Sequence, residues 1–357
     1  EERSVPDRSQ CIASGVSTQG LRCRLISIVS LILLTGIILI VLFTRESSKD
    51  PNLERAALLE KLKPLLTNIS RQELYMNGSV PSLAVDWLLY QSNFKAYSFD
   101  RQVQRFAMAS FYYSTDGESW IENNGWLTDD DECTWYQTTN KDVCVNGSLR
   151  VLSLINNSIY GLLPNDFALL SSLEILNLAT NRVAGSIPST LSSLRILALQ
   201  ENDYASFPDG LTHLTKLQVL RLLGNRINGT IPMDIFSKLT MLKTYDVSRS
   251  ELSGEIPNTI QYLTSLETLN FLNNALNGTI PTEVGMLKNL QNFWIQFNSF
   301  SGDIPSEIGQ CTELKSLALH GNILDGSIPT EIGHCTELTL LALYGTVLRG
   351  SIPIEIG

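Results

Sequence analysis

Histidine, the most common general base in enzymes, is scarce in this chain. The three histidines are His213, His320 and His334. Neither His213 nor His334 has a recognisable triad partner in the sequence, and the chain contains no phosphate-binding loop and no kinase signature. We therefore predict that the chain is not an enzyme and needs no cofactor.

An acidic run is the other candidate for chemistry, in this case metal binding. Asp129, Asp130, Asp131 and Glu132 are consecutive. A calcium loop of the EF-hand type needs ligands at alternate positions and a central glycine, and this run has neither. We expect a solvated loop and no metal site.

The composition excludes nucleic acid as a partner. The formal net charge is −10, and charged residues make up 17% of the chain, against about 25% in an average soluble domain. Binding to phosphate backbones requires concentrated Lys and Arg. Because the first residue is Glu1, we expect the natural protein to begin earlier.

Residues 25–43 form an uncharged stretch of the length that crosses a membrane. They read LISIVSLILLTGIILIVLF, with Arg22 and Arg24 before them and Arg45 after them. A helix of this length spans about 28 Å, close to the ~30 Å of a hydrocarbon core, whereas the apolar part of a signal peptide is shorter. We predict one transmembrane helix at 25–43.

Two signals for the orientation of this helix oppose each other. Lys and Arg are slightly more numerous after the span, which favours a cytosolic C-terminal side. Sequons for N-glycosylation favour the reverse, although some are expected by chance. They begin at Asn68, Asn77, Asn146, Asn156, Asn228 and Asn277.

The part of the chain from Leu149 onward is a repeat array. The pattern L-x-x-L-x-L-x-x-N-x-L-x-G-x-I-P recurs nine times, at intervals of about 24 residues. Positions one, four, six, eleven and fifteen supply a core that neighbouring repeats share, and position nine offers an amide to the turn after the strand. The ninth residues are Asn157, Asn181, Asn202, Asn225, Ser250, Asn274, Asn298, Asn322 and Thr346.

This pattern resembles plant-type (G-x-I-P) leucine-rich repeats, which occur in extracellular receptor and defence proteins. The resemblance implies an α/β solenoid, a leucine-rich repeat horseshoe with a parallel concave sheet. The third repeat, with NDYASFPDG, lacks both the glycine and the isoleucine. The array stops within a repeat, so we expect the natural protein to continue beyond Gly357.

The segment before the repeats has the composition of a cap for the first repeat. Residues 103–111 have apolar residues at helical spacing, and 81–90 is a shorter helix candidate. Four of the five tryptophans also lie before the repeats. We predict a helical N-terminal cap that covers the apolar edge of the array.

Cys133 and Cys144, together with the run RFAMASFYYSTDGESW that precedes them, resemble membrane-anchored extracellular leucine-rich repeat proteins of diatoms and related algae. The resemblance implies a disulfide between these two cysteines in the cap. Disulfides persist in oxidising compartments, so we expect the C-terminal side to be extracellular, most simply at the plasma membrane.

The remaining cysteines have simpler interpretations. Cys311 and Cys335 share one repeat position and are expected to be small buried apolar residues, although a bridge between adjacent repeats is geometrically conceivable. Cys23, at the membrane edge, is either palmitoylated or unmodified.

The predicted organisation has five parts: a cytosolic tail (1–24), the transmembrane helix (25–43), a stalk (44–79), the cap (80–148) and nine repeats (149–357), truncated at the C-terminus. Side chains alternate along a strand, so positions three, five, seven and eight face outward from the concave sheet. The predicted ligand-binding residues at these positions are Arg221, Asp246, Arg249, Asn270, Trp294, Gln296, Phe297, His320 and Tyr344.

The predicted function is that of an anchored extracellular recognition protein, receptor-like or adhesive, that binds a peptide, protein or glycan on the concave face. Two alternatives remain open. One is an inhibitor or defence protein that acts against wall-degrading enzymes, and the other is a structural wall or adhesion protein.

Overall fold

The computed structural model describes residues 51–136 and 143–356. The predicted tail, transmembrane helix and Cys23 lie outside these residues. No helix within the two described ranges is long and apolar enough to span a membrane.

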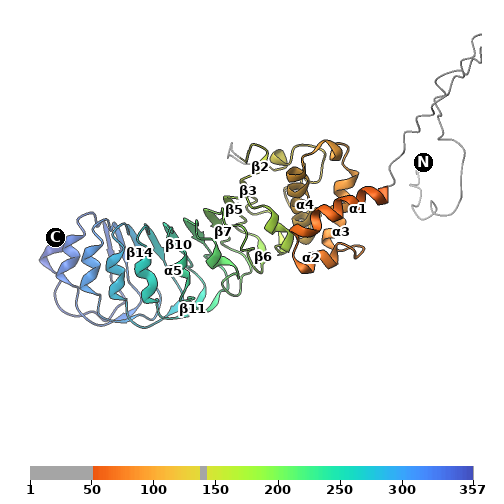
Figure 1. The fold of residues 1–357 in the computed structure, drawn as a ribbon. Helices are drawn as coiled ribbons and strands as arrows, with labels where there is room; N and C mark the ends of the chain where they lie inside the picture. The colour runs from red at the N-terminus through yellow and green to blue at the C-terminus, as the bar shows by residue number, and fades with distance from the viewer. Residues whose placement is uncertain (1–50, 137–142, 357) are drawn as a thin grey trace, which may run out of the picture. The chain divides into compact units, whose positions relative to one another are not determined.

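A parallel sheet of nine short strands forms one side of the repeat array, with one strand from each predicted repeat (Figure 1). Every strand pairs in parallel with the strand of the next repeat, in register, as Leu269 does with Phe293. The strands are β3 (Val151–Ser153), β5 (Ile175–Asn177), β7 (Ile196–Ala198), β8 (Val219–Arg221), β10 (Thr244–Asp246), β12 (Thr268–Asn270), β14 (Asn292–Trp294), β16 (Ser316–Ala318) and β18 (Leu340–Ala342).

A second short parallel strand follows the first one in several repeats and extends the stacking beyond the turn. They are β4 (Tyr160–Leu162) with β6 (Arg182–Ala184); β9 (Asn228–Thr230), β11 (Glu251–Gly254) and β13 (Ala275–Leu276); and β15 (Ser301–Gly302) with β17 (Ile323–Leu324).

Every repeat except the second then returns through a short helical turn on the side of the core away from the nine-stranded sheet. A proline precedes several of these turns, for example Pro257 and Pro305, because it lacks the N–H that a helix start would leave unpaired. The turns are η6 (Asn165–Leu169), η7 (Leu211–His213), α5 (Ile235–Lys238), η8 (Asn258–Tyr262), η9 (Thr282–Met286), η10 (Ser306–Gln310), η11 (Thr330–His334) and η12 (Ile354–Ile356).

The ninth-position asparagines form a ladder inside the solenoid. The Asn298 amide donates to the carbonyls of Phe271 (2.9 Å) and Ile295 (3.0 Å), and its oxygen accepts from the Leu276 N–H (3.0 Å). Asn181, Asn202, Asn225, Asn274 and Asn322 repeat this arrangement. The ladder weakens at Ser250, whose buried hydroxyl has no partner among the described residues.

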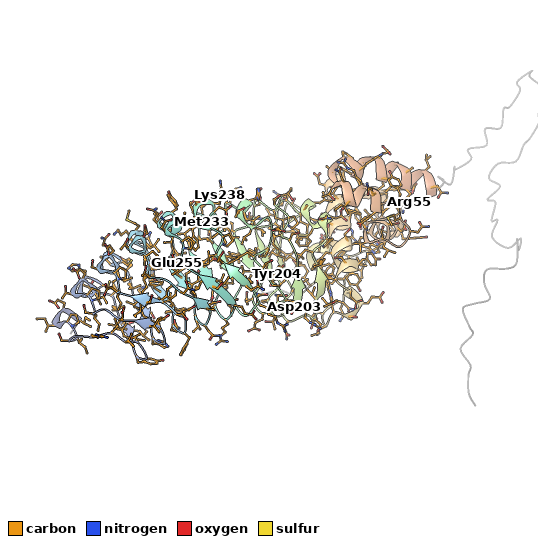
Figure 2. The ribbon with its side chains drawn as sticks, turned by 90° about the horizontal axis from the view of Figure 1, so that it is seen from below. Arg55, Asp203, Tyr204, Met233, Lys238 and Glu255 are labelled. Carbon is orange, nitrogen blue, oxygen red and sulfur yellow. A yellow bond between two sulfur atoms is a disulfide. The ribbon has the colours of Figure 1, made fainter. Side chains whose placement is uncertain are left out.

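The third repeat keeps its place in the stack despite its unusual sequence. Tyr204 stands at the eleventh position and is buried within the core, while the adjacent Asp203 is exposed and pairs with Arg182 (Figure 2). No second strand follows β7 in this repeat. An aromatic ring thus replaces the usual leucine in the shared core.

Cys311 and Cys335 are unbridged and buried, as the sequence predicts for small apolar residues. Their thiols donate to the carbonyls of Val284 (3.3 Å) and Ile308 (3.5 Å). Burial raises the pKa of Cys311 to about 12, so this thiol is neutral and unreactive at physiological pH.

Helices occupy the region before the repeats. The two helices expected at 81–90 and 103–111 are present as α3 (Val80–Tyr90) and α4 (Phe99–Ser114), and hydroxyls of Ser79 and Ser98 cap their first turns. The other elements are α1 (Pro51–Leu62), η2 (Lys63–Leu65), α2 (Asn68–Glu73), η3 (Phe94–Ala96), η4 (Gly117–Ser119), η5 (Glu132–Thr134) and the hairpin strands β1 (Cys144–Val145) and β2 (Ser148–Leu149).

This helical region shares its core with the first repeats. Phe111 contacts Trp120, Trp126 and also Phe167 of the first repeat, with the Phe111 and Phe167 ring centroids 5.2 Å apart. Asn157, the first member of the asparagine ladder, exchanges hydrogen bonds with Glu122. The apolar edge of the array is therefore covered at its N-terminal end.

The structure differs from the expectation of a stalk at 44–79. Within this range α1 and α2 are folded, and Leu58, Leu62 and Leu74 are buried. They pack with α3 and with Phe106 of α4 in a second apolar cluster. Residues 51–79 therefore extend the helical region, because these three leucines face α3 rather than solvent.

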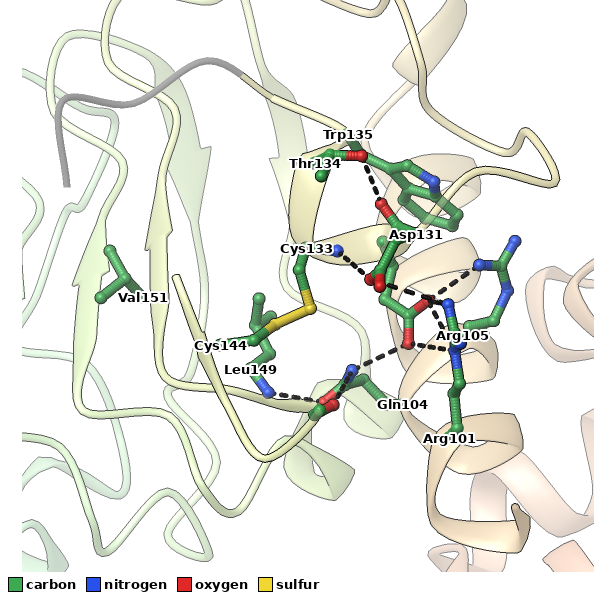
Figure 3. The surroundings of a disulfide bond; sticks show 12 residues. Arg101, Gln104, Arg105, Asp131, Cys133, Thr134, Trp135, Cys144, Leu149 and Val151 are labelled. Atoms are coloured by element: carbon green, nitrogen blue, oxygen red, sulfur yellow. Dashed lines mark hydrogen bonds and ion pairs between the residues drawn. A yellow bond between two sulfur atoms is a disulfide. The ribbon is translucent and has the colours of Figure 1, made fainter. Parts of the chain in front are cut away.

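The predicted disulfide joins Cys133 to Cys144 beside a buried ionic cluster (Figure 3). Glu132 is 1% exposed and accepts from Arg101 and Arg105, each at 2.8 Å. Gln104 also donates to Glu132, at 3.0 Å, and accepts from the Leu149 N–H. The acidic run is therefore not wholly a solvated loop, because its last residue is buried and pairs with two arginines of α4.

Candidate ligand-binding surface

The outer face of the nine-stranded sheet, called here the open sheet face, carries the predicted ligand-binding residues. Register pairing places Arg221, Asp246, Asn270 and Trp294 side by side on neighbouring strands. The alternation predicted from sequence holds in β14 and the residues after it, since Phe293, Ile295 and Phe300 are fully buried in the core. Trp294 and Phe297 lie on the opposite side and are partly or half exposed.

Two arginines on this face are exposed and carry unpaired charge. Arg221 ends β8, and Arg249 follows β10 in the next repeat. Neither guanidinium has an ion pair or side-chain hydrogen bond within the described residues, whereas Arg150 and Lys243, just before β3 and β10, pair with Glu174 and Glu267. The open sheet face therefore offers two free cationic groups on adjacent repeats.

Asp246 and Asn270 make hydrogen bonds to neighbouring residues of the sheet, whereas the sequence predicts that they contact a ligand. Asp246 accepts from the backbone and hydroxyl of Ser248 (3.0 and 2.7 Å). Asn270 donates to the Ser248 hydroxyl (3.3 Å), accepts from the Leu272 N–H and is only 6% exposed. Asn270 is consequently a buried support of the strand and not an exposed contact.

Trp294 lies across the next repeat in a fixed orientation. Its indole N–H donates to the hydroxyl of Ser316, a position-three residue outside the predicted ligand-binding set (2.8 Å). Gln296 is partly buried, and its side-chain oxygen has no partner in the described part of the chain. The ring is thus held by a second strand, while the Gln296 oxygen is a buried acceptor without a partner in the described part of the chain.

Phe297, His320 and Tyr344 form a continuous aromatic shelf across the last three repeats. The Phe297 ring meets His320 edge-on, with centroids 5.0 Å apart, and His320 stacks on Tyr344 at 4.2 Å. Phe297 is 50% and Tyr344 67% exposed, but His320 is only 9% exposed, contrary to its expected exposure. Burial lowers the pKa of His320, which favours a neutral imidazole between the two rings.

The asparagines of all six sequons are exposed, and Asn228 and Asn277 occupy equivalent positions in their repeats. His213 and His334 are exposed on the helical turns, away from the open sheet face. Among the described residues, no group of three or more His, Cys, Asp or Glu side chains is placed to hold a metal ion.

Comparison with known proteins identifies the repeats. The family model described as Leucine Rich Repeat matches residues 148–170, 172–194 and 289–311. No curated protein matches the chain.

Three solved structures illustrate the similarity. The ectodomain of the Arabidopsis thaliana receptor kinase GASSHO1/SCHENGEN3, in complex with CASPARIAN STRIP INTEGRITY FACTOR 2, is 33% identical over 58% of this chain and 26% of that chain, with a TM-score of 0.56. The plant peptide hormone receptor RGFR1, in complex with RGF2, is 30% identical over 58% of this chain and 38% of that chain, with a TM-score of 0.51.

The ectodomain of the Arabidopsis receptor kinase HAESA, in complex with an IDA peptide hormone ligand, is 27% identical over 72% of this chain and 51% of that chain, with a TM-score of 0.51. The chain therefore spans between about a quarter and about half of these receptor ectodomains. It carries leucine-rich repeats stacked into a solenoid with a parallel sheet, and plant ligand-binding receptor ectodomains are among its structural neighbours.

Proposed function

We propose that this chain is the recognition part of a membrane-anchored extracellular protein that binds a peptide or protein segment on its open sheet face. The observation that carries the proposal is the combination on one face of two unpaired arginines and an exposed aromatic shelf. Aromatic and arginine side chains are the most frequent energetic anchors of protein interfaces.

The spacing of these anchors suits an extended ligand. Three strand spacings separate β8, which bears Arg221, from β14, which bears Trp294. At ~4.8 Å per spacing the separation is about 14 Å, which an extended peptide covers in about four residues. Arginine pairs well with carboxylates, so the ligand would present an acidic group at one end and apolar groups at the other.

The mechanism is binding without a covalent step. The rings of Trp294 and Phe297 are held by Ser316 and His320 before a ligand arrives, so little side-chain entropy is lost on association. The peptide complexes of the similar plant receptors support a peptide ligand over a glycan. An inhibitor of wall-degrading enzymes and a structural wall protein remain the alternative functions.

Replacing Trp294 and Tyr344 together with alanine is expected to weaken peptide binding about 100-fold or more, because each ring acts as a separate anchor. The full chain in lipid nanodiscs would be panned against a displayed random-peptide library, and affinities of the selected peptides would then be measured. Tyr262→Ala with Met286→Ala is the matched control, since both side chains are about half exposed on the helical turns. Unchanged affinity of the Trp294/Tyr344 variant, or equal loss in the control, would contradict the proposal.

The proposed location rests on residues 25–43 as an anchor and on the Cys133–Cys144 disulfide, which is stable in an oxidising compartment. If residues 51–356 face outward, their exposed sequons are accessible to glycosylation. A peptide N-glycosidase should then increase the gel mobility of the protein produced in eukaryotic cells. Mobility that does not change on digestion would count against this orientation, and a variant with all six sequon asparagines replaced by glutamine is the control.

A further inference from the structure

The residue before each ladder position has a left-handed backbone conformation. Glycine, which adopts positive φ freely, fills this eighth position at Gly224, Gly321 and Gly345. The other repeats hold residues with side chains there at φ between 51° and 57°: Asn156, Thr180, Glu201, Arg249, Asn273 and Phe297. Asparagine tolerates this conformation, but a bulky residue is strained by it.

Phe297 is the largest side chain at an eighth position and has a φ of 57°. Its ring extends over the next repeat, because a Cβ added to Gly321 would lie 2.7 Å from the Phe297 Cδ1 atom. One repeat further, a Cβ on Gly345 would meet only backbone of Gly321, at 3.5 Å. The missing Cβ of Gly321 therefore leaves room for the Phe297 ring over the next repeat.

Burial does not explain why this strained residue is a phenylalanine. Half of the side chain is exposed, and glycine or asparagine at this position would keep the same backbone without the strain. Thr180, Glu201 and Arg249 share this backbone conformation, so what distinguishes Phe297 is a half-exposed aromatic ring, which is available for a contact outside the chain. Its edge-on packing against His320 fixes the direction in which the free ring face points.

We propose that Phe297 is a specificity-determining contact that receives a flat apolar side chain, a proline or an aromatic residue, of an extended peptide. The inference rests on the proposed function and adds the chemistry of the ligand. Arg249 lies two strand spacings away, which is about 10 Å, and its free charge is complementary to an acidic residue. The flat residue and the acidic residue should therefore lie about three or four positions apart.

The strain can be tested without any ligand. The Phe297→Gly variant is expected to melt about 2 °C or more above the Phe297→Ala variant, because only glycine relieves the left-handed backbone. Ser299 is the matched control, since it is exposed nearby with an ordinary φ, and there the alanine variant should melt above the glycine variant. The same order at both positions would overturn the assignment of strain to Phe297.

Binding is tested with the displayed library of random dodecapeptides on the full chain in nanodiscs. The wild-type protein should enrich peptides with a proline or aromatic residue three or four positions from an acidic residue. Phe297→Gly should lower their affinity about 10-fold, while Arg249→Gln should remove the preference for the acidic residue and keep the preference for the flat residue.

The outcomes separate the two proposals. Enriched peptides that bind Phe297→Gly as tightly as the wild type would overturn this inference and leave peptide recognition standing. A library that yields no specific binder, or a protein that binds glycans on an array instead of peptides, would overturn the proposed function and this inference with it.

Discussion

Replacing Glu132 with alanine is expected to lower the free energy of unfolding of the helical region by about 3–5 kcal/mol. Arg105 is fully buried, and its guanidinium lies between the rings of Trp87, Tyr97 and Trp135 with Glu132 as its only anionic partner among the described residues. Without the carboxylate this buried charge loses its counter-ion, and the rings and carbonyls around it compensate only in part.

The measurement is chemical denaturation followed by near-ultraviolet circular dichroism, which reports on the tryptophans around Arg105. Asp203→Ala is the matched control, because the Arg182–Asp203 pair is an exposed carboxylate–arginine contact and should contribute less than about 1 kcal/mol. A loss as small as that of the control would show that the buried pair is not needed for the stability of this region.

The asparagine ladder should show the second large effect. Asn298→Ala is expected to cost about 3 kcal/mol, because the Leu276 N–H and the carbonyls of Phe271 and Ile295 lose a partner inside the solenoid. Thermal and urea unfolding of the full chain would measure this loss.

The converse substitution introduces an asparagine at Ser250, the ninth-position residue where the ladder is interrupted. Ser250→Asn is expected to stabilise the protein by about 1 kcal/mol. By analogy with Asn274, the new amide would reach the carbonyls of Leu222 and Val247, and its oxygen would accept from the Ile227 N–H. If Asn298→Ala were neutral, or Ser250→Asn destabilising, the hydrogen-bond ladder would not be a main source of stability.

Repeat periodicity in the sequence determines most of the array. Because inward and outward side chains alternate along a strand, the register alone separated the buried Phe293 and Ile295 from the outward Trp294. The same register predicted that the ladder asparagines lie at the turn after each strand and that Cys311 and Cys335 are buried, since equivalent positions of the repeats have the same local environment. The resemblance of the cysteine motif also led to the correct disulfide.

Only the tertiary structure decides which polar and apolar side chains remain accessible to solvent. Glu132 is buried because arginines of α4, 27 and 31 residues earlier, come to surround it, and nothing in the local acidic run indicates that contact. Leu58 and Leu62 of α1, and Leu74 just after α2, are buried because they face α3. Asn270 and His320 are covered by side chains from neighbouring repeats, Ser248 in one case and Phe297 and Tyr344 in the other. Local sequence determines the direction of a side chain, whereas its exposure depends on what the folded chain brings beside it.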